Sequence, residues 1–287
     1  MAPAAPAAPP PLLLSTSPML KLYSTFLPQA SPRSAPPAFL NQIALGVVFL
    51  TLARNLWWYL VLAPNGWAWD DDGNFALSCL TAIAFSGLLL LPLLHQLLTH
   101  PTRRPCARIS DSSPRWNYVS SCVVAYCCAY MLQDGFHTLN KAYIPNPNSI
   151  GVMALTDDDV MFLLHHAITL AYMGTARYLG AGHYSCMLLM FFGEVTNPIH
   201  NTFLTTEKAS LLHPGPRVEL IKLVSGKIFA LLYGVVRIAV GPLLGAWITY
   251  DLLFTKRGRE NVPVLVSFVW CAATFGVLHG SVPSTTP

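Results

Sequence analysis

The chain has 287 residues, of which 53% are hydrophobic and only 10% are charged. Charged residues make up about 25% of an average soluble domain, so the composition excludes an ordinary soluble enzyme. The formal net charge is only +4, and no stripe rich in lysine and arginine with interleaved aromatic residues occurs. These features exclude a basic nucleic-acid-binding protein, and we expect a chain that is integral to a membrane.

Seven apolar runs meet or approach the length of about 20 residues that a helix needs to cross a bilayer. The runs are residues 39–62, 75–98, 116–133, 159–179, 184–204, 228–254 and 262–279. They predict an all-α fold, a polytopic membrane helical bundle with about seven transmembrane helices and one membrane domain.

The segments around these runs complete the expected organisation. Residues 1–38 are rich in Ala, Pro and Ser and contain no acidic residue, which predicts a disordered tail; a cleaved organelle transit peptide is the alternative. Residues 39–74 then form the first transmembrane helix and an acidic loop, residues 75–280 the main membrane domain, and residues 281–287 a short tail.

Lysine and arginine residues are distributed unequally between the two sides that seven spans would create. One side carries most of them: Lys21, Arg33, Arg103, Arg104, Arg108, Arg115, Arg177, Lys256, Arg257 and Arg259. These residues favour the cytosolic side, so we expect a cytosolic amino terminus. This topology makes residues 218–227 an interfacial segment, with Lys222 and Lys227 reaching the headgroups, and makes Pro242 a kink in the sixth span.

The seven cysteines have the pattern of small buried hydrophobic residues. Only Cys106 lies in a polar loop, and no Cys-x-x-Cys pair occurs, which speaks against a zinc site or a disulfide framework. A histidine–carboxylate metal site is a weaker alternative, because only the remote His137 supplies a third imidazole. We therefore expect no metal and no cofactor.

Ionisable residues inside the apolar runs are costly unless they face a cavity or a partner, so each one suggests a function. Helical spacing places Asp158, His165, Thr169 and Tyr172 along one stripe of the fourth run, with His166 about 100° away. Glu194, Asn197 and Asn201 share one face of the fifth run. The two runs are antiparallel and bring His166 and Glu194 to similar depths, so we expect these two side chains to be in contact.

Four further residues complete the polar pattern. Pro198 is expected to kink the fifth span and to free a backbone carbonyl near Glu194 for a ligand. Arg237 in the sixth span is the expected counter-charge for Glu194 or for a lipid phosphate. Asp134 lies at the end of the third span, and Arg54, followed by three aromatic residues, is expected to anchor the first span at the interface.

These observations define a candidate site with two groups of residues. The catalytic candidates are His165, His166 and Glu194, and the ligand-binding candidates are Asp134, Asn197, Asn201, Arg237 and Tyr172. A shared intramembrane cavity explains the set. The alternative is that the same groups hold neighbouring helices together through hydrogen bonds of about 0.6–2 kcal/mol each.

At these residues the sequence resembles the TLC domain family, which is shared by translocation-associated membrane proteins, longevity-assurance ceramide synthases and the ceroid-lipofuscinosis type 8 protein. The resemblance covers roughly residues 75–280. The segments that carry it are Arg115-Trp116-Asn117, Tyr130, Asp134, Phe162-Leu163-Leu164-His165-His166, Gly193-Glu194-Val195-Thr196-Asn197-Pro198 and Val236-Arg237-Ile238-Ala239-Val240-Gly241-Pro242.

The resemblance implies about six core helices around a lipid-accommodating cavity, in the endoplasmic reticulum or a connected endomembrane; the plasma membrane and a plastid are the alternatives. Ceramide synthases transfer a fatty acyl group from coenzyme A, and their paired histidines are the catalytic candidates. Their following span carries His-Asp-x-x-Asp, whereas this chain has Glu194 and Asn197. It therefore resembles more the TLC-domain-containing branch, which is linked to membrane lipid composition.

The residue pattern and the resemblance are compatible with three functions. The first is a role in membrane lipid homeostasis, with an acyl lipid bound or handled in an intramembrane cavity and membrane lipids as the partners. The second is an acyltransferase of the ceramide synthase type, with acyl-coenzyme A as co-substrate and the paired histidines in catalysis. The third is a lipid transporter or trafficking receptor.

Overall fold

The structure is a computed structural model that describes residues 36–141 and 157–279. Nearly all of these residues are helical. No strand occurs in these two ranges, which confirms the all-α prediction. The predicted tails lie outside the described residues, except that residues 36–38 already belong to the first helix.

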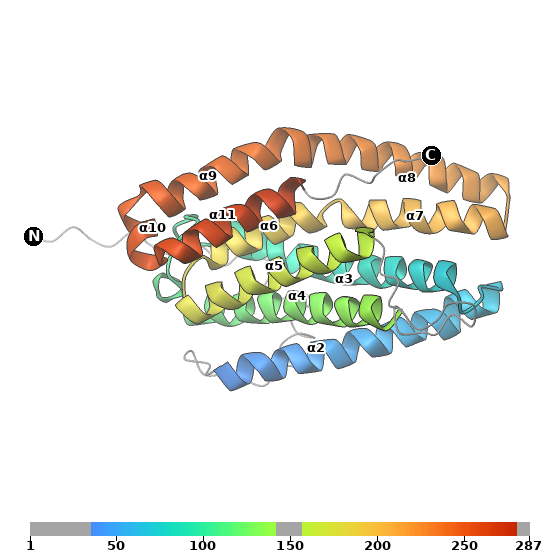
Figure 1. Ribbon diagram of the computed structural model, residues 1–287, viewed down its shortest axis with the longest axis horizontal. Helices are drawn as coiled ribbons and strands as arrows, with labels where there is room; N and C mark the ends of the chain where they lie inside the picture. The colour runs from blue at the N-terminus through green and yellow to red at the C-terminus, as the bar shows by residue number, and fades with distance from the viewer. Residues whose placement is uncertain (1–35, 142–156, 280–287) are drawn as a thin grey trace, which may run out of the picture.

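Seven helical passes alternate in direction along the long axis of the described bundle (Figure 1). They are α2 (Pro36–Trp57), extended by the π-helical turn η2 (Trp58–Leu62); α3 (Asp71–Thr99); α4 (Pro114–Lys141); α5 (Asp157–Leu179); α6 (His183–Glu194) with α7 (Asn197–Leu212); α8 (Pro216–Tyr233) with η5 (Gly234–Val240) and α9 (Gly241–Phe254); and α11 (Val264–His279). The short helices η3 (Ala63–Asn65), η4 (Ile109–Asp111) and α10 (Lys256–Asn261) lie in the connections.

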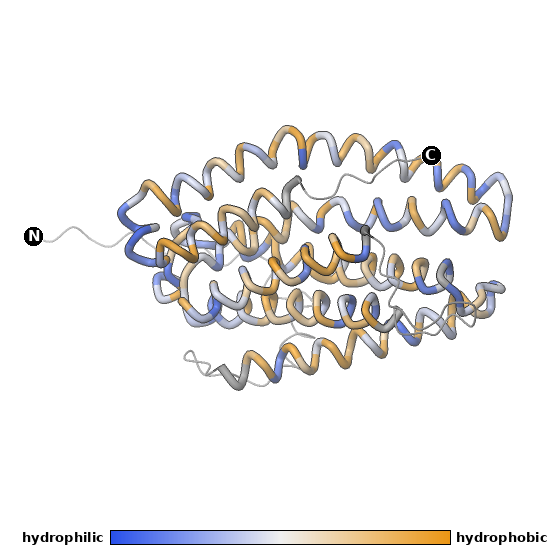
Figure 2. Tube along the Cα trace, viewed as in Figure 1, coloured by the Kyte–Doolittle hydropathy of each residue, from blue (hydrophilic) through white to orange (hydrophobic). Residues whose placement is uncertain are grey.

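Within the described residues, three helical segments are long and apolar enough to cross a membrane: Phe39–Asn65, Asp72–Thr99 and Pro216–Phe254. Apolar residues dominate the middle of the bundle and hydrophilic residues gather at its two ends (Figure 2). The chain therefore has the character of a membrane bundle. Seven spans require that α4, α5, α6–α7 and α11 also cross the bilayer. This stays a prediction, because α4, α5 and α6–α7 contain polar residues of the candidate site and the apolar part of α11, Val264–Gly276, is shorter.

The core lies where α3, α4, α5 and α6 meet. Phe85 of α3 is fully buried and stacks on Tyr130 of α4, with ring centroids 3.9 Å apart. Trp270 of α11 closes the core against α5 and is also fully buried. All seven cysteines are buried and none forms a disulfide. Cys106, expected in a polar loop, is buried, and its backbone N–H is satisfied by a hydrogen bond to Asp251 of α9 at 2.8 Å.

Two passes depart from the expected single helices. The fifth breaks at Val195 and Thr196, and α7 continues to Leu212 instead of ending near residue 204. The sixth begins at Pro216, so residues 218–227 are the first part of a continuous 39-residue helical segment that packs along α7. The π-helical turn η5 ends directly before Gly241 and Pro242, and its wider turn accommodates the missing N–H of Pro242. Figure 1 shows the long helix bending along its course.

The contact between α2 and α4 depends on a glycine. A Cβ atom on Gly46 would lie 2.6 Å from the Cβ of Ala129 in α4. We expect Gly46→Ala to force the two helices apart and to lower the free energy of unfolding by about 1–3 kcal/mol, measured by denaturant titration in detergent micelles.

Gly87→Ala is the matched control for this prediction. Gly87 is also helical, but a Cβ there meets nothing within 4 Å, so the variant should gain up to about 1 kcal/mol from the better helix propensity of alanine. Equal effects of the two variants would contradict the proposed close contact.

Candidate functional site

The break between α6 and α7 sets the position of the first carboxylate. Pro198 has no N–H, so the backbone cannot continue regular hydrogen bonds across this point, and α6 ends at Glu194. The carbonyl oxygen of Gly193 accepts a hydrogen bond from Nη2 of Arg237 at 3.2 Å. A carbonyl freed next to the kink is thus bound by η5 of the protein itself, where the sequence analysis expects a ligand.

Glu194 is buried and joins α6 to three other elements. Its Oε2 accepts hydrogen bonds from Oγ of Ser86 in α3 at 2.8 Å and from Nδ2 of Asn197 in α7 at 2.7 Å. Arg237, also buried, lies close enough to interact with Glu194 electrostatically. The expected counter-charge role of Arg237 therefore agrees with its placement.

His166 is 4% exposed and faces α4. Its Nδ1 lies 2.9 Å from the carbonyl oxygen of Phe162. Because a carbonyl oxygen only accepts, Nδ1 carries the hydrogen. Nε2 lies 3.6 Å from Oδ2 of Asp134 and has no hydrogen-bond partner among the described residues.

The carboxylate that faces His166 is thus Asp134, not Glu194 as the depth argument predicts. The physical reason is helix packing, since α5 contacts α4 more extensively than it contacts α6. Glu194 still lies within electrostatic range of His166.

His165 lies on a different side of α5 from its neighbour. The two imidazole rings are 5.9 Å apart with their planes at 68°, and His165 is half-buried. Arg237 is near enough to interact with it electrostatically. The paired histidines therefore connect two parts of one polar cluster, with Asp134 on one side and Arg237 on the other.

Arg54 is a member of this cluster that the sequence analysis assigns to the interface. It is only 4% exposed, its Nη1 donates to Oγ of Ser78 at 3.0 Å, and Asp134 interacts with it electrostatically. The spacing of Gln42, Leu50 and Arg54 in the sequence places them on one face of a helix and could have predicted a position of Arg54 inside the bundle. In the structure all three side chains are buried. The three neighbouring aromatic residues concealed that pattern.

The buried charges of this region balance. Arg54 and Arg237 supply two guanidinium groups, and Asp134 and Glu194 supply two carboxyl groups, all at most 7% exposed. Isolated ions in a medium of low dielectric constant are strongly destabilised, whereas compensated ones are tolerated. We call Arg54, Asp134, His165, His166, Glu194 and Arg237 the polar cluster.

Two predicted ligand-binding residues have other partners. The hydroxyl group of Tyr172 lies 2.9 Å from Oγ of Ser185, and its ring packs against Trp270 with centroids 4.6 Å apart. Nδ2 of Asn201 donates to the backbone oxygen of Asn197 at 2.9 Å. Asn197 itself contacts Glu194, so of these three only Asn197 touches the polar cluster.

Two surface grooves lie elsewhere, one between α7 and α8 and one among α9, α10 and α11, and residues outside the polar cluster line both. Within residues 36–141 and 157–279, no group of three or more His, Cys, Asp or Glu side chains has the arrangement of a metal site.

An all-helical membrane bundle with a charge-balanced polar cluster at its centre is the class of protein that the fold and the site define. A comparison with protein-family models matches the TLC domain over residues 74–280. The chain therefore belongs to the TLC domain family, whose members are generally linked to lipid metabolism or homeostasis. No curated protein and no solved structure matches the chain.

Charge compensation between Glu194 and Arg237 predicts a non-additive pair of substitutions. Glu194→Ala leaves the buried guanidinium of Arg237 without this counter-charge, which should cost about 3–5 kcal/mol of unfolding free energy. Glu194→Ala combined with Arg237→Ala should cost about 0.5–3 kcal/mol less than the sum of the two single variants, measured by denaturant titration in micelles.

The exposed ion pair between Lys208 and Asp72, at 2.6 Å, provides the control. Its side chains are substantially exposed, so Lys208→Ala should cost at most about 1 kcal/mol. Strict additivity of the Glu194 and Arg237 variants would show that the two charges do not compensate each other.

Proposed function

We propose that the protein acts in membrane lipid homeostasis by binding an acyl lipid whose polar headgroup reaches the polar cluster. The observation that carries this proposal is the geometry at His166. In the neutral ring with hydrogen on Nδ1, both Nε2 and the Asp134 carboxylate are acceptors, and they face each other at 3.6 Å. A headgroup amine, amide or hydroxyl that donates to Nε2 would satisfy the buried acceptor that has no partner among the described residues, beside the Asp134 carboxylate.

The surroundings of the histidines support access from the lipid. Phe162 and Leu164, which flank the pair on α5, are exposed apolar residues, as is Ile238 beside Arg237 on η5. In a bilayer these side chains contact hydrocarbon. An acyl chain can therefore lie along this surface while its headgroup reaches the half-buried His165 and the cluster behind it.

The orientation and compartment complete the proposal. The α3–α4, α5–α6 and α9–α11 connections lie at one end of the bundle and carry exposed basic residues such as Arg103, Arg104 and Arg257. The preference of basic residues for the cytosolic side supports a cytosolic location for this end and for the amino terminus. The family relationship favours the endoplasmic reticulum or a connected endomembrane.

Lipid analysis of cells tests the proposal. Cells that lack the chain are rescued with the wild type, His166→Ala, His165→Ala or the double variant, at equal expression, and total lipids are quantified by mass spectrometry. We expect the double variant to fail to restore the wild-type lipid profile. At least one lipid species that co-purifies with the wild-type protein should fall by about tenfold in His166→Ala, the loss that corresponds to about 1.4 kcal/mol.

His95→Ala is the matched control. His95 is a half-buried helical histidine of α3 that contacts Gln96 and lies outside the polar cluster. Full restoration of the lipid profile by the double variant would overturn the proposal and leave the cluster with a structural role.

An acyltransferase is the second candidate, and the Asp134–His166 pair favours it. An unprotonated Nε2 can accept the proton of an acceptor amine or hydroxyl while that acceptor attacks the thioester carbonyl of acyl-coenzyme A. The carbon–sulfur bond then breaks, the coenzyme A thiolate takes up the proton, and Asp134 stabilises the transient imidazolium. In this arrangement the carbonyl oxygen of Phe162 orients the ring through Nδ1, and Asp134, not the catalytic candidate Glu194, is the carboxylate beside Nε2.

An acyl-transfer assay distinguishes this candidate from lipid binding alone. The purified protein is incubated with acyl-coenzyme A and a panel of long-chain amine and lysolipid acceptors. A transferase should form an acylated product, and His166→Ala should lower its rate by about 10²–10⁴-fold, the usual contribution of a general base. His95→Ala should leave the rate unchanged. No histidine-dependent product with any acceptor would eliminate the catalytic candidate and leave the binding proposal standing.

A further inference from the structure

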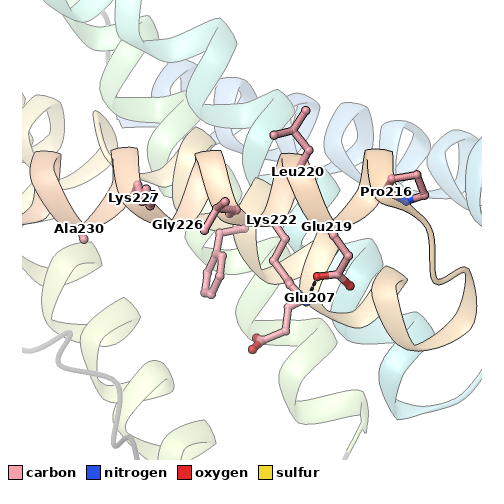
Figure 3. Close-up of a pocket in the computed structure, with 10 residues that line it drawn as sticks. Glu207, Pro216, Glu219, Leu220, Lys222, Gly226, Lys227 and Ala230 are labelled. Carbon is pink, nitrogen blue, oxygen red and sulfur yellow. Dashed lines mark ion pairs between the residues drawn. The ribbon is translucent and has the colours of Figure 1, made fainter.

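A groove follows the antiparallel pair of helices α7 and α8, away from the polar cluster. It has a volume of about 740 Å³, within the roughly 300–1,000 Å³ of small-molecule sites. Figure 3 shows its lining, in which Lys222 of α8 reaches down to Glu219 while Glu207 of α7 points away from that pair. Leu220, Leu223 and Ala230 give it an apolar wall.

The groove lies at the depth of the lipid headgroups. The helical segment Pro216–Phe254 has 39 residues and is therefore about 58 Å long. The helical segment is therefore longer than a whole bilayer, which is roughly 40–45 Å thick with its headgroups. At least one end of the segment must extend beyond the hydrocarbon core. The α8 end carries Arg217, Glu219, Lys222 and Lys227, whereas Asp251 is the only charged residue of α9.

Two of the charges in the groove have no ion-pair partner among the described residues. Lys222 is paired with Glu219 at 2.6 Å and donates to Ser210 at 3.3 Å. Glu207 and Lys227, which are exposed, take part in no such pair within the described ranges. A groove with one available cation and one available carboxylate matches a ligand that carries both charges.

The helix register sets the order of these two charges along the membrane normal. Gly226 packs against the ring of Phe203, because a Cβ on Gly226 would approach the ring to 3.1 Å. Lys227 is thus level with residue 202 of α7, and Glu207 lies about five residues nearer the α7–α8 turn, which corresponds to about 7–8 Å. The cation is therefore the deeper charge and the carboxylate the outer one.

We propose that this groove binds the headgroup of a zwitterionic phospholipid, with the phosphate at Lys227 and the ammonium group at Glu207. In such a lipid the phosphate is attached next to the glycerol and the ammonium group lies at the outer end, which is the order of the two charges in the groove. The small side chain of Ala230, one turn deeper than Lys227, leaves the groove open toward the hydrocarbon for an acyl chain.

Native mass spectrometry of the full chain in detergent micelles tests the site. The protein is titrated separately with dioleoylphosphatidylcholine, dioleoylphosphatidylglycerol and dioleoylglycerol. We expect the wild type to prefer phosphatidylcholine over phosphatidylglycerol by about tenfold, because the anionic lipid offers no cation to Glu207. Dioleoylglycerol, which carries neither charge, should bind the most weakly.

Two variants separate the charges. Lys227→Gln should weaken the binding of both phospholipids by about tenfold, whereas Glu207→Gln should weaken only phosphatidylcholine and bring the ratio of the two affinities close to one. Ala230→Trp fills the groove without changing a charge and should weaken the binding of all three lipids. Lys256→Gln, which removes an exposed cation at the opposite end of the bundle, should change nothing.

Three results would overturn the proposal. They are equal affinities of the two phospholipids for the wild type, an unchanged affinity ratio in Glu207→Gln, or an effect of Lys256→Gln as large as that of Lys227→Gln. His166→Ala should leave the phosphatidylcholine preference of the groove intact. Failure of lipid binding in the groove and failure of lipid binding at the polar cluster are therefore detected with different variants.

Discussion

Compensation of buried charge is the constraint on which the centre of this bundle depends. The low dielectric constant of a membrane interior makes a single guanidinium or carboxylate very unfavourable there. Arg54 from α2, Asp134 from α4, Glu194 from α6 and Arg237 from η5 together give formal neutrality. Each charge comes from a different pass, so the relative positions of four helices are coupled through one set of interactions.

The same constraint explains how the irregular backbone contributes to the site. Pro198 interrupts the fifth pass at the end of α6, and the guanidinium of Arg237 donates a hydrogen bond to the carbonyl oxygen of Gly193 beside this break. Arg237 lies in the π-helical turn η5, a feature that is frequent at functional sites. Two local departures from α-helical geometry thus meet at one point and bring Glu194, Asn197 and Arg237 together.

Much of the architecture was predictable from the sequence, because the length and periodicity of apolar runs identify helices and Pro198 marks a break. The partner of His166 was not. Helical periodicity states which residues share a face but not which neighbouring helix that face meets, and α5 turns His166 toward Asp134 of α4. Arg54 was misplaced for a related reason, since its aromatic neighbours suggested the interface while its i+4 relation to Leu50 places it in the bundle.

The burial of all seven thiols has a practical consequence for mapping the chain in a native bilayer. A thiolate reacts only when reagent reaches it and when it is deprotonated, and an apolar environment opposes both. Water-soluble maleimides should therefore not label the native cysteines. A single cysteine introduced into one connecting loop at a time would then report on which side of the membrane that loop lies, without replacement of the native residues.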